Sequence, residues 1–315
     1  MAENKKKHVG GQAVIEGVMM RSAEYVSVAV RKPDGKIVLK RDPFQSLTKR
    51  IKILGWPFFR GGITLIESMV LGIKALNFSA DVAITEEEKK GTQKKPKKKK
   101  KQEDSKNSNW MMMITVVLAL GLGIGLFFYL PLVLTDLTGV KGGVLFNLID
   151  GGIRLIFFLM YLFLISLWKE IRRIFEYHGA EHKSIFAYEH EQPLTIKGVQ
   201  SFTTHHPRCG TSFLLVVMLV SICVFILLGR PETIQDRLIR FLFIPVIGGI
   251  SYEIIRLADK KIGRFIAKTL VAPGLWLQRI TTKEPDESQL EVALVALKSA
   301  LDIEVDPQVE FVSSP

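Results

Sequence analysis

Four apolar runs are each long enough to cross a lipid bilayer, which requires about 20 mostly apolar residues. They cover residues 110–134, 144–168, 211–228 and 238–255. The first and third contain no charged residue, and the second and fourth contain two each. For each run the alternative is a buried helix in the core of a soluble domain. The runs predict a mainly α-helical, polytopic membrane protein with about four transmembrane helices.

Lysines and arginines beside these runs predict the orientation, because short cytoplasmic flanks are enriched in both residues. They cluster before the first run (86–109), after the second (Lys169, Arg172, Arg173) and after the fourth (Arg256, Lys260, Lys261, Arg264). With four crossings, all three clusters lie on one side. We therefore expect a multi-pass protein of the cell (plasma) membrane, with both termini and the loop 169–210 in the cytoplasm.

The segment 86–109 holds ten lysines and five acidic residues, and it contributes much of the net charge of +12. Its low complexity leaves nothing to bury in a core, so we expect a disordered linker. Lysines close to a membrane attract anionic lipid headgroups by about 1 kcal/mol each. No arginine or aromatic residue interrupts the lysines, which argues against nucleic-acid binding. The expected partner is the lipid bilayer, and self-association into a homo-oligomer stays open.

The part before the linker, residues 1–85, is expected to be cytosolic or interfacial and of α+β type. Residues 25–41 alternate apolar and polar side chains around the turn sequence "PDG", which predicts a β-hairpin. Residues 47–83 look helical beyond Gly62. Their many apolar side chains fit an amphipathic helix in the membrane interface, and a helix packed on the hairpin is an equal alternative.

The part after the last run begins with an apolar stretch that is too short to span a bilayer and is expected to lie in the interface. Residues 285–301 then predict a soluble helix, because apolar residues recur at helical spacing and Asp286 or Ser288 can cap its start. The predicted division of the chain is 1–85, 86–109, 110–264 and 265–315.

The predicted loop 169–210 contains the pattern H-x-x-E-H, formed by His178, Glu181 and His182. On a helix the two histidines are four residues apart and share one face. Two imidazoles so placed can bind one Zn²⁺ ion, or another divalent metal, through ring nitrogens. Glu181 borders the same face and could take a proton from water during metal-assisted hydrolysis. The alternative is a polar helix end with no metal.

A catalytic zinc site commonly has three protein ligands and one open position, so a third ligand is needed. Four residues on the same predicted side of the membrane are candidates: His205, His206, Cys209 and Glu253. Glu253 stands out because an acidic residue within a membrane segment is costly and marks a functional site by default. Cys209 is expected to be reduced, because Cys223 would be about 21 Å away along a helix.

The motif is separated from the membrane by a distance that requires explanation. His178 lies ten residues after Trp168, which is about 15 Å along a straight helix. Either the second apolar run ends later than predicted, or the motif lies on a separate helix that folds back. We favour the separate helix, because it would also bring residues 203–210 close to the motif.

Five segments together resemble the YqhQ-like bacterial membrane proteins, a family of unknown function labelled predicted metal-dependent enzymes. They are "GGQAVIEGVMMR" (10–21), "GWPFFRGG" (55–62), "EYHGAEHK" (176–183), "HHPRCGTSF" (205–213) and "SYEIIR" (251–256). The resemblance implies a metal-dependent enzyme of the bacterial inner membrane and leaves its substrate open. Glu16, in the first segment, is a buried acid, a metal ligand or a surface residue.

Two functions fit these patterns. In the first, the protein is a membrane hydrolase in which Glu181 activates water beside a zinc ion, and the substrate is a peptide or a lipid. In the second, the same residues form a structural or regulatory metal site, or none, in a membrane scaffold or transport-associated protein. A structural site would be closed by four protein ligands and would include Cys209.

Overall fold

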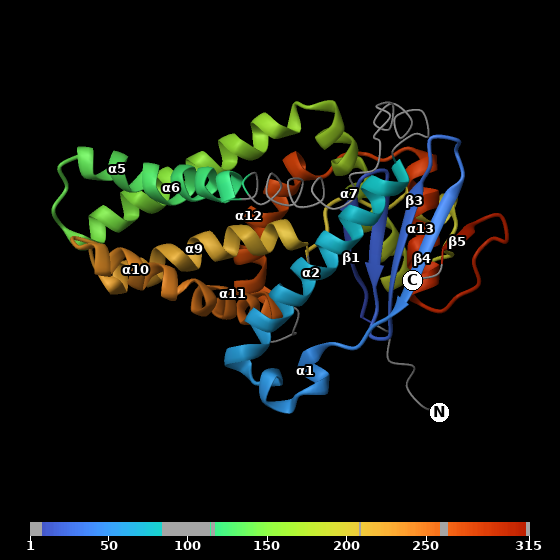
Figure 1. The fold of residues 1–315 in the computed structure, drawn as a ribbon, viewed down its shortest axis with the longest axis horizontal. Helices are drawn as coiled ribbons and strands as arrows, with labels where there is room; N and C mark the ends of the chain where they lie inside the picture. The colour runs from blue at the N-terminus through green and yellow to red at the C-terminus, as the bar shows by residue number, and fades with distance from the viewer. Residues whose placement is uncertain (1–7, 84–113, 115–116, 208, 259–263, 313–315) are drawn as a thin grey trace, which may run out of the picture. The chain divides into compact units, whose positions relative to one another are not determined.

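The structure is a computed structural model that describes residues 8–83, 114, 117–207, 209–258 and 264–312 (Figure 1). The segment 86–109, expected to be a disordered linker, lies outside the described residues. The chain divides into two compact units. The sheet unit comprises Met1–Thr85, Leu164–Val217 and Pro245–Pro315, and the helical unit comprises Glu86–Phe163 and Met218–Ile244.

The sheet unit is built on a five-stranded sheet with the strand order β1-β2-β3-β4-β5. The strands are β1 (Gly10–Val14), β2 (Gly17–Arg21), β3 (Tyr25–Arg31), β4 (Ile37–Pro43) and β5 (Glu310–Val312). The first four are antiparallel to their neighbours, and β5 runs parallel to β4. The predicted hairpin is confirmed as β3–β4, and Gly35 in its turn has a φ of +89°. The hairpin β1–β2 was not predicted.

Helices cover both faces of this sheet, because side chains along a strand alternate between the faces. One face packs on α2 (Pro57–Ala83) and buries Val14, Met19, Val26, Val28 and Val30. The other buries Val18, Met20, Ala29, Ile37 and Leu39 against α7 (Lys169–Glu189) and α13 (Glu287–Ala300). In Figure 1, α2 crosses the sheet on the side facing the viewer, and α13 lies behind the strands.

The predicted helix 285–301 is confirmed as α13, and Asp286 is its N-cap. The Asp286 side chain accepts a hydrogen bond from the backbone of Gln289, whose side chain reaches back to the cap in a capping box. Although a soluble amphipathic helix was expected, α13 is buried along most of its length, including Leu290 and Leu297. It is therefore the central helix of the core.

Helix α2 combines the two alternatives left open by the sequence. Leu71, Ala75, Phe78 and Val82 pack against the sheet. Large apolar side chains on the remainder of its surface are exposed: Ile66, Met69, Val70, Ile73 and Leu76. The spacing of this exposed stripe is that of one helix face. The helix thus packs on the hairpin and also presents an apolar surface.

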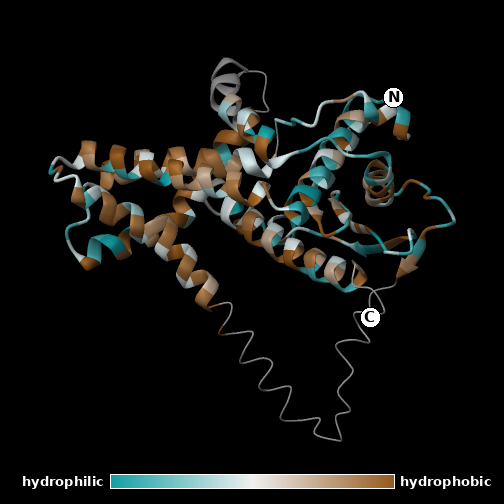
Figure 2. Cartoon of the chain, turned by 90° about the horizontal axis from the view of Figure 1, so that it is seen from above, coloured by the Kyte–Doolittle hydropathy of each residue, from teal (hydrophilic) through white to brown (hydrophobic). Residues whose placement is uncertain are grey.

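Within the described residues, five helical segments are long and apolar enough to cross a membrane: Arg60–Ala83, Val117–Leu137, Gly143–Ser166, Gly210–Leu228 and Ile234–Arg256. The last four match the predicted runs, and the first belongs to α2. Hydrophobic residues dominate the long helices in Figure 2. The chain is mainly helical with a small sheet of mostly N-terminal strands, and these helices indicate a membrane protein.

The remaining described elements are short helices and the helices that make up the apolar segments. They are α1 (Leu47–Arg50), η1 (Lys52–Gly55), η2 (Gly125–Tyr129), α5 (Leu130–Leu137), α6 (Gly143–Ser166), α8 (Ile196–Gln200), α9 (Gly210–Leu228), α10 (Ile234–Leu242), α11 (Ile244–Ala258) and α12 (Arg264–Thr281). A capping box between Thr233 and Asp236 starts α10.

The helical unit contains a buried polar cluster on α6 and α10. Arg154 donates to Asp150 over 2.9 Å, and Arg240 lies 3.7 Å from the same carboxylate oxygen. Arg240 also donates to the side chain of Asn147 at 2.7 Å. The Arg154 guanidinium donates to the carbonyls of Phe127 and Phe128 at 3.3 Å each. These contacts explain how charged residues are accommodated within apolar helices.

Candidate metal centre

Helix α7 presents the H-x-x-E-H motif. It begins at Lys169, and the residue before it, Trp168, is extended with a ψ of 134°. The predicted separate helix is therefore confirmed, because α6 ends at Ser166. His178 and His182 lie one turn apart on α7, and their ring centroids are 4.4 Å apart.

Cys209 completes a group of three potential ligands. It lies just before α9, and its Sγ is 3.2 Å from the Nε2 of His178. The ligand atoms of His178, His182 and Cys209 all lie within 4.8 Å of one another. Tetrahedral zinc with ordinary Zn–S and Zn–N bonds would separate a sulfur and a nitrogen ligand by about 3.6 Å. The spacing of the three side chains therefore fits one metal ion.

Hydrogen bonds orient both imidazoles toward this group. Nδ1 of His178 lies 2.8 Å from the carbonyl of Thr281, and Nδ1 of His182 lies 2.5 Å from that of Thr204. Because a carbonyl only accepts, each Nδ1 carries the proton and each Nε2 keeps a lone pair. Histidine ligands in metal sites are commonly held in this way by a second hydrogen bond.

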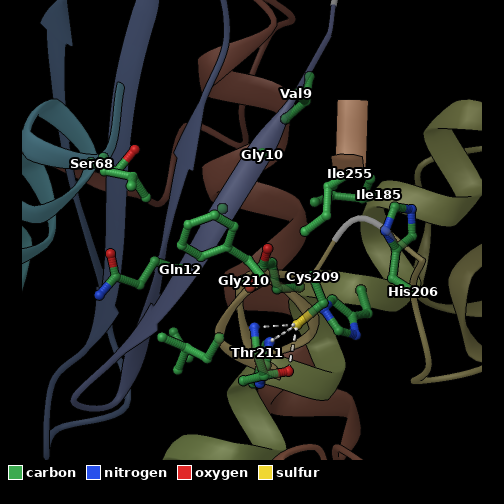
Figure 3. A pocket seen from close by; sticks show the side chains of 18 of the residues that line it. Val9, Gly10, Gln12, Ser68, Ile185, His206, Cys209, Gly210, Thr211 and Ile255 are labelled. Carbon is green, nitrogen blue, oxygen red and sulfur yellow. Dashed lines mark hydrogen bonds between the residues drawn. The ribbon is translucent and has the colours of Figure 1, made fainter. Parts of the chain in front are cut away.

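The surroundings of His182 also favour its metal-binding form. Burial lowers the pKa of His182, although hydrogen bonds with Cys209 and Thr204 act in the opposite direction. Its imidazole is therefore neutral at physiological pH. The backbone N–H of Thr211 donates a hydrogen bond to the Cys209 sulfur over 3.4 Å. Figure 3 shows this sulfur with its hydrogen bonds.

Glu181 is buried beside the ligand group, with 5% of its surface exposed. Burial raises the pKa of its carboxyl group, while His178, His206 and a hydrogen bond with the backbone of Gly11 act to lower it. Gly11 belongs to β1, so the glycine-rich N-terminal segment contacts the motif directly. The sequence had left the role of this segment open.

A cavity of about 660 Å³ opens on these side chains. Its wall includes β1, α2, α7, α11 and the start of α9, and contains His178, Glu181, His182 and Cys209. Figure 3 shows Cys209 with other lining residues such as Val9, Gln12 and His206. Most of the remaining lining is apolar, as in Leu65, Ile174, Phe213 and Ile255. The volume is that of an ordinary small-molecule site.

The other three candidate ligands lie in different surroundings. Glu253 accepts hydrogen bonds from Arg60, one of them over 2.6 Å. His206 has its Nε2 3.2 Å from a carboxylate oxygen of Glu189, and its ring is 5.6 Å from that of His182. Nδ1 of His205 lies 3.1 Å from the Thr203 hydroxyl. The structure thus groups Cys209 with the motif histidines. That any of these residues binds a metal stays a prediction.

Glu16 lies at the turn between β1 and β2, where its φ is +51°. Its carboxylate is ion-paired with Arg173 of α7 and accepts a hydrogen bond from Tyr177 at 3.3 Å. The sequence left three roles open for Glu16. In the structure its carboxylate is partly exposed and forms an ion pair. The pair joins the β1–β2 turn to the motif helix.

Two glycines allow close approaches to the motif helix. A β-carbon at Gly179 would lie 2.0 Å from the carbonyl oxygen of Lys283, so that only glycine allows this approach. Gly11 makes a similar approach to Glu181. These close contacts could have been inferred from the sequence, because both glycines lie within or next to segments that also carry candidate ligands.

Comparison with known proteins places the chain in a family. The family described as "Protein of unknown function (DUF1385)" matches residues 56–303. The chain is 35% identical to a Bacillus subtilis (strain 168) protein named "Uncharacterized protein YqhQ", over 94% of this chain and 92% of that protein. No solved structure matches. The chain therefore belongs to the DUF1385 family.

Proposed function

We propose that the protein is a metal-dependent hydrolase of the cell membrane, in which His178, His182 and Cys209 hold a divalent metal, with zinc as the first candidate. The observation that carries the proposal is the opening of this three-ligand group onto a cavity. Three protein ligands with one open position are typical of catalytic zinc. A metal held there would supply Lewis acidity toward a scissile carbonyl or phosphoryl group.

Glu181 is the proposed general base. It lines the same cavity as the ligands, and burial raises the pKa of its carboxyl group, which brings it closer to neutral pH. A base is most effective when its pKa is near the operating pH. Glu181 would accept a proton from the attacking water, while Gly11 holds the carboxylate in place. The bond cleaved belongs to a peptide or to a lipid.

The proposed topology has four crossings, formed by the apolar helices of residues 117–137, 143–166, 210–228 and 234–256. Helix α2 is the fifth candidate, and we assign it to the membrane surface. One face of α2 is occupied by the sheet, and the exposed stripe from Ile66 to Leu76 suits the lipid interface. Both termini and the metal centre then lie on the cytoplasmic side, as the flanking lysines and arginines favour.

A structural or regulatory metal site in a membrane scaffold is the second candidate. The observation favouring it is the cysteine ligand, since thiolates are frequent in closed structural zinc sites. Such a site requires a fourth protein ligand, and His206 is the nearest further histidine, with its ring 5.6 Å from that of His182.

Substitution of Glu181 separates the two functions. The Glu181→Gln protein should keep its metal, because the three ligands are unchanged, and should lose hydrolysis of membrane lipids or peptides, because an amide cannot accept the proton. The His178→Ala protein should lose the metal. Metal content would be measured on purified protein, and products by mass spectrometry after incubation with lipid extract and peptide mixtures.

The matched control is Glu170→Gln, which makes the same chemical change at an exposed position of α7. It should retain both metal and activity. A Glu181→Gln protein that binds metal and keeps full cellular function would end the hydrolase proposal and leave the structural site.

A further inference from the structure

A second cavity, of about 620 Å³, adjoins the one that contains the candidate ligands. The two cavities share the lining residues Val9, Gly10, Thr64, Tyr252 and Arg256. They are therefore neighbouring parts of one depression in the sheet unit. A substrate bound at the metal centre could extend into this second part.

The lining of the second cavity is basic. It contains Arg21, Lys49, Arg60 and Arg256, together with His8, and no acidic residue is among the described residues that form it. Arg60 is neutralised by Glu253, which it contacts through two hydrogen bonds. One further carboxylate is close by: Glu67 accepts hydrogen bonds from Ser46 and from the backbone of Leu47.

The other three cations have no such partner. Within the described part of the chain, Arg21, Lys49 and Arg256 form no ion pair, and Nη1 of Arg21 is buried without a hydrogen-bond partner. The cavity therefore has an excess of positive charge.

We propose that this basic cavity binds a phosphate group of the molecule that is hydrolysed at the metal centre, an inference that rests on the function proposed above. Guanidinium groups pair with phosphate through two parallel hydrogen bonds, and lysine adds a point charge. The substrate class is thus a phosphate-bearing compound. The proposed binding residues are Arg21, Lys49 and Arg256.

The surface beside the cavity favours a lipid headgroup as the source of the phosphate. The segment 47–56 contributes Thr48, Lys49 and Gly55 to the lining. The same segment exposes four large apolar side chains, Leu47, Ile51, Ile53 and Trp56, and carries three basic residues, Lys49, Arg50 and Lys52. Exposed apolar and basic side chains in one short segment are typical of attachment to an anionic membrane surface. A soluble phosphate ester is the other source.

Binding would be measured by calorimetry on the full-length, metal-loaded Glu181→Gln protein in neutral detergent, so that turnover does not consume the probe. The probes are dihexanoyl phosphatidic acid, inorganic phosphate and dihexanoylglycerol, which lacks the phosphate. Phosphatidic acid should bind and dihexanoylglycerol should not. Tighter binding of phosphatidic acid than of inorganic phosphate assigns the site to lipid, and equal binding assigns it to soluble phosphates.

The double variant Lys49→Gln/Arg256→Gln removes two cations that hold no described hydrogen bond through their side chains, so the fold should be retained. Its affinity for the phosphate probe should fall about tenfold or more, because charged hydrogen bonds to the phosphate are lost. The control Arg50→Gln/Lys52→Gln removes the same charge from exposed positions that line neither cavity. Its affinity should change less than about threefold, as expected for screened surface charges.

The inference is overturned if neither phosphate probe binds, if dihexanoylglycerol binds equally well, or if both double variants weaken binding to the same extent. Failure of the proposed function looks different. In that case the protein still binds the phosphate probe, and the Lys49→Gln/Arg256→Gln variant still binds it more weakly. His178→Ala and Glu181→Gln, however, leave hydrolysis and cellular function unchanged.

Discussion

Gly11 packs against the side chain of Glu181 so closely that a β-carbon on residue 11 would lie 2.8 Å from Cγ and 2.9 Å from Oε1 of the glutamate. Contacts this short force a shift of one partner. Because Glu181 is the proposed base, its position relative to the ligands depends on a glycine about 170 residues earlier in the chain.

The Gly11→Ala substitution is expected to slow hydrolysis about a hundredfold without removing the metal. The added methyl group displaces the Glu181 carboxylate, while the hydrogen bonds that hold His178 and His182 come from Thr281 and Thr204. A misplacement of about 1 Å can reduce a rate about a hundredfold. Metal content and rate would be measured on the same preparation.

Gly10→Ala is the control for this prediction, because a β-carbon at Gly10 meets no atom within 4 Å. It should retain metal and activity. Equal activity of the Gly11→Ala and Gly10→Ala proteins would show that the position of Glu181 does not matter for the reaction.

Cys209→Ser is expected to weaken metal binding, because a hydroxyl is a poorer zinc ligand than a thiolate. In cobalt-substituted protein the sulfur-to-metal charge-transfer band should disappear. Cys223→Ser is the matched control, since Cys223 is also a free cysteine but is exposed. A charge-transfer band that survives in the Cys209→Ser protein would exclude Cys209 as a ligand.

The sequence identified the residues that form the ligand group but not their arrangement. The i, i+4 spacing on a helix placed His178 and His182 together. The choice among four candidate third ligands depended on tertiary contacts near Thr204 and His206. The carbonyl of Thr204 lies 2.5 Å from Nδ1 of His182, and the Gln278 side chain accepts a hydrogen bond from the backbone N–H of His206 and donates one to its carbonyl. Contacts this distant in sequence leave no local pattern.

The fold, too, was predictable where the signal is local in the sequence and not where it depends on distant contacts. Alternation and turn residues predicted β3–β4, and capping residues predicted α13. The hairpin β1–β2 was missed because its first strand is glycine-rich and its turn, Ile15–Glu16, lacks the residues favoured in two-residue turns. The three-residue β5 pairs with a strand about 270 residues earlier. Helix α13 is buried on most sides because the C-terminal part of the chain packs back against the N-terminal sheet. The sequence of α13 alone did not predict this burial.

The core around α13 offers a test of the fold. Leu297 has no exposed surface, whereas Ile303, a few residues later, is 44% exposed. Leu297→Ala should lower the free energy of unfolding by about 2–5 kcal/mol, through lost burial and a remaining cavity. Ile303→Ala should change it by less than about 1 kcal/mol. Denaturant titration of the purified protein in detergent would compare them, and similar values would contradict the central position of α13.

The buried cluster of the helical unit leads to a prediction about charge. Asp150 faces Arg154 and Arg240, and these residues are 1%, 8% and 6% exposed. Asp150→Asn would leave two guanidinium groups without a counter-charge. Removing one partner of a buried ion pair costs about 3–5 kcal/mol, because the remaining charge stays desolvated. The thermal unfolding midpoint in detergent should therefore fall.

Asp136→Asn is the matched control, because Asp136 also pairs with an arginine, Arg230, over 3.0 Å. In this pair the side chains are 41% and 28% exposed. Exposed pairs contribute about 0–1 kcal/mol, so the midpoint should hardly move. Adding Arg240→Gln to Asp150→Asn should restore part of the lost stability, since it removes one of the two unbalanced charges. Equal midpoints for the Asp150→Asn and Asp136→Asn proteins would mean that water reaches the cluster and that its charges are not buried.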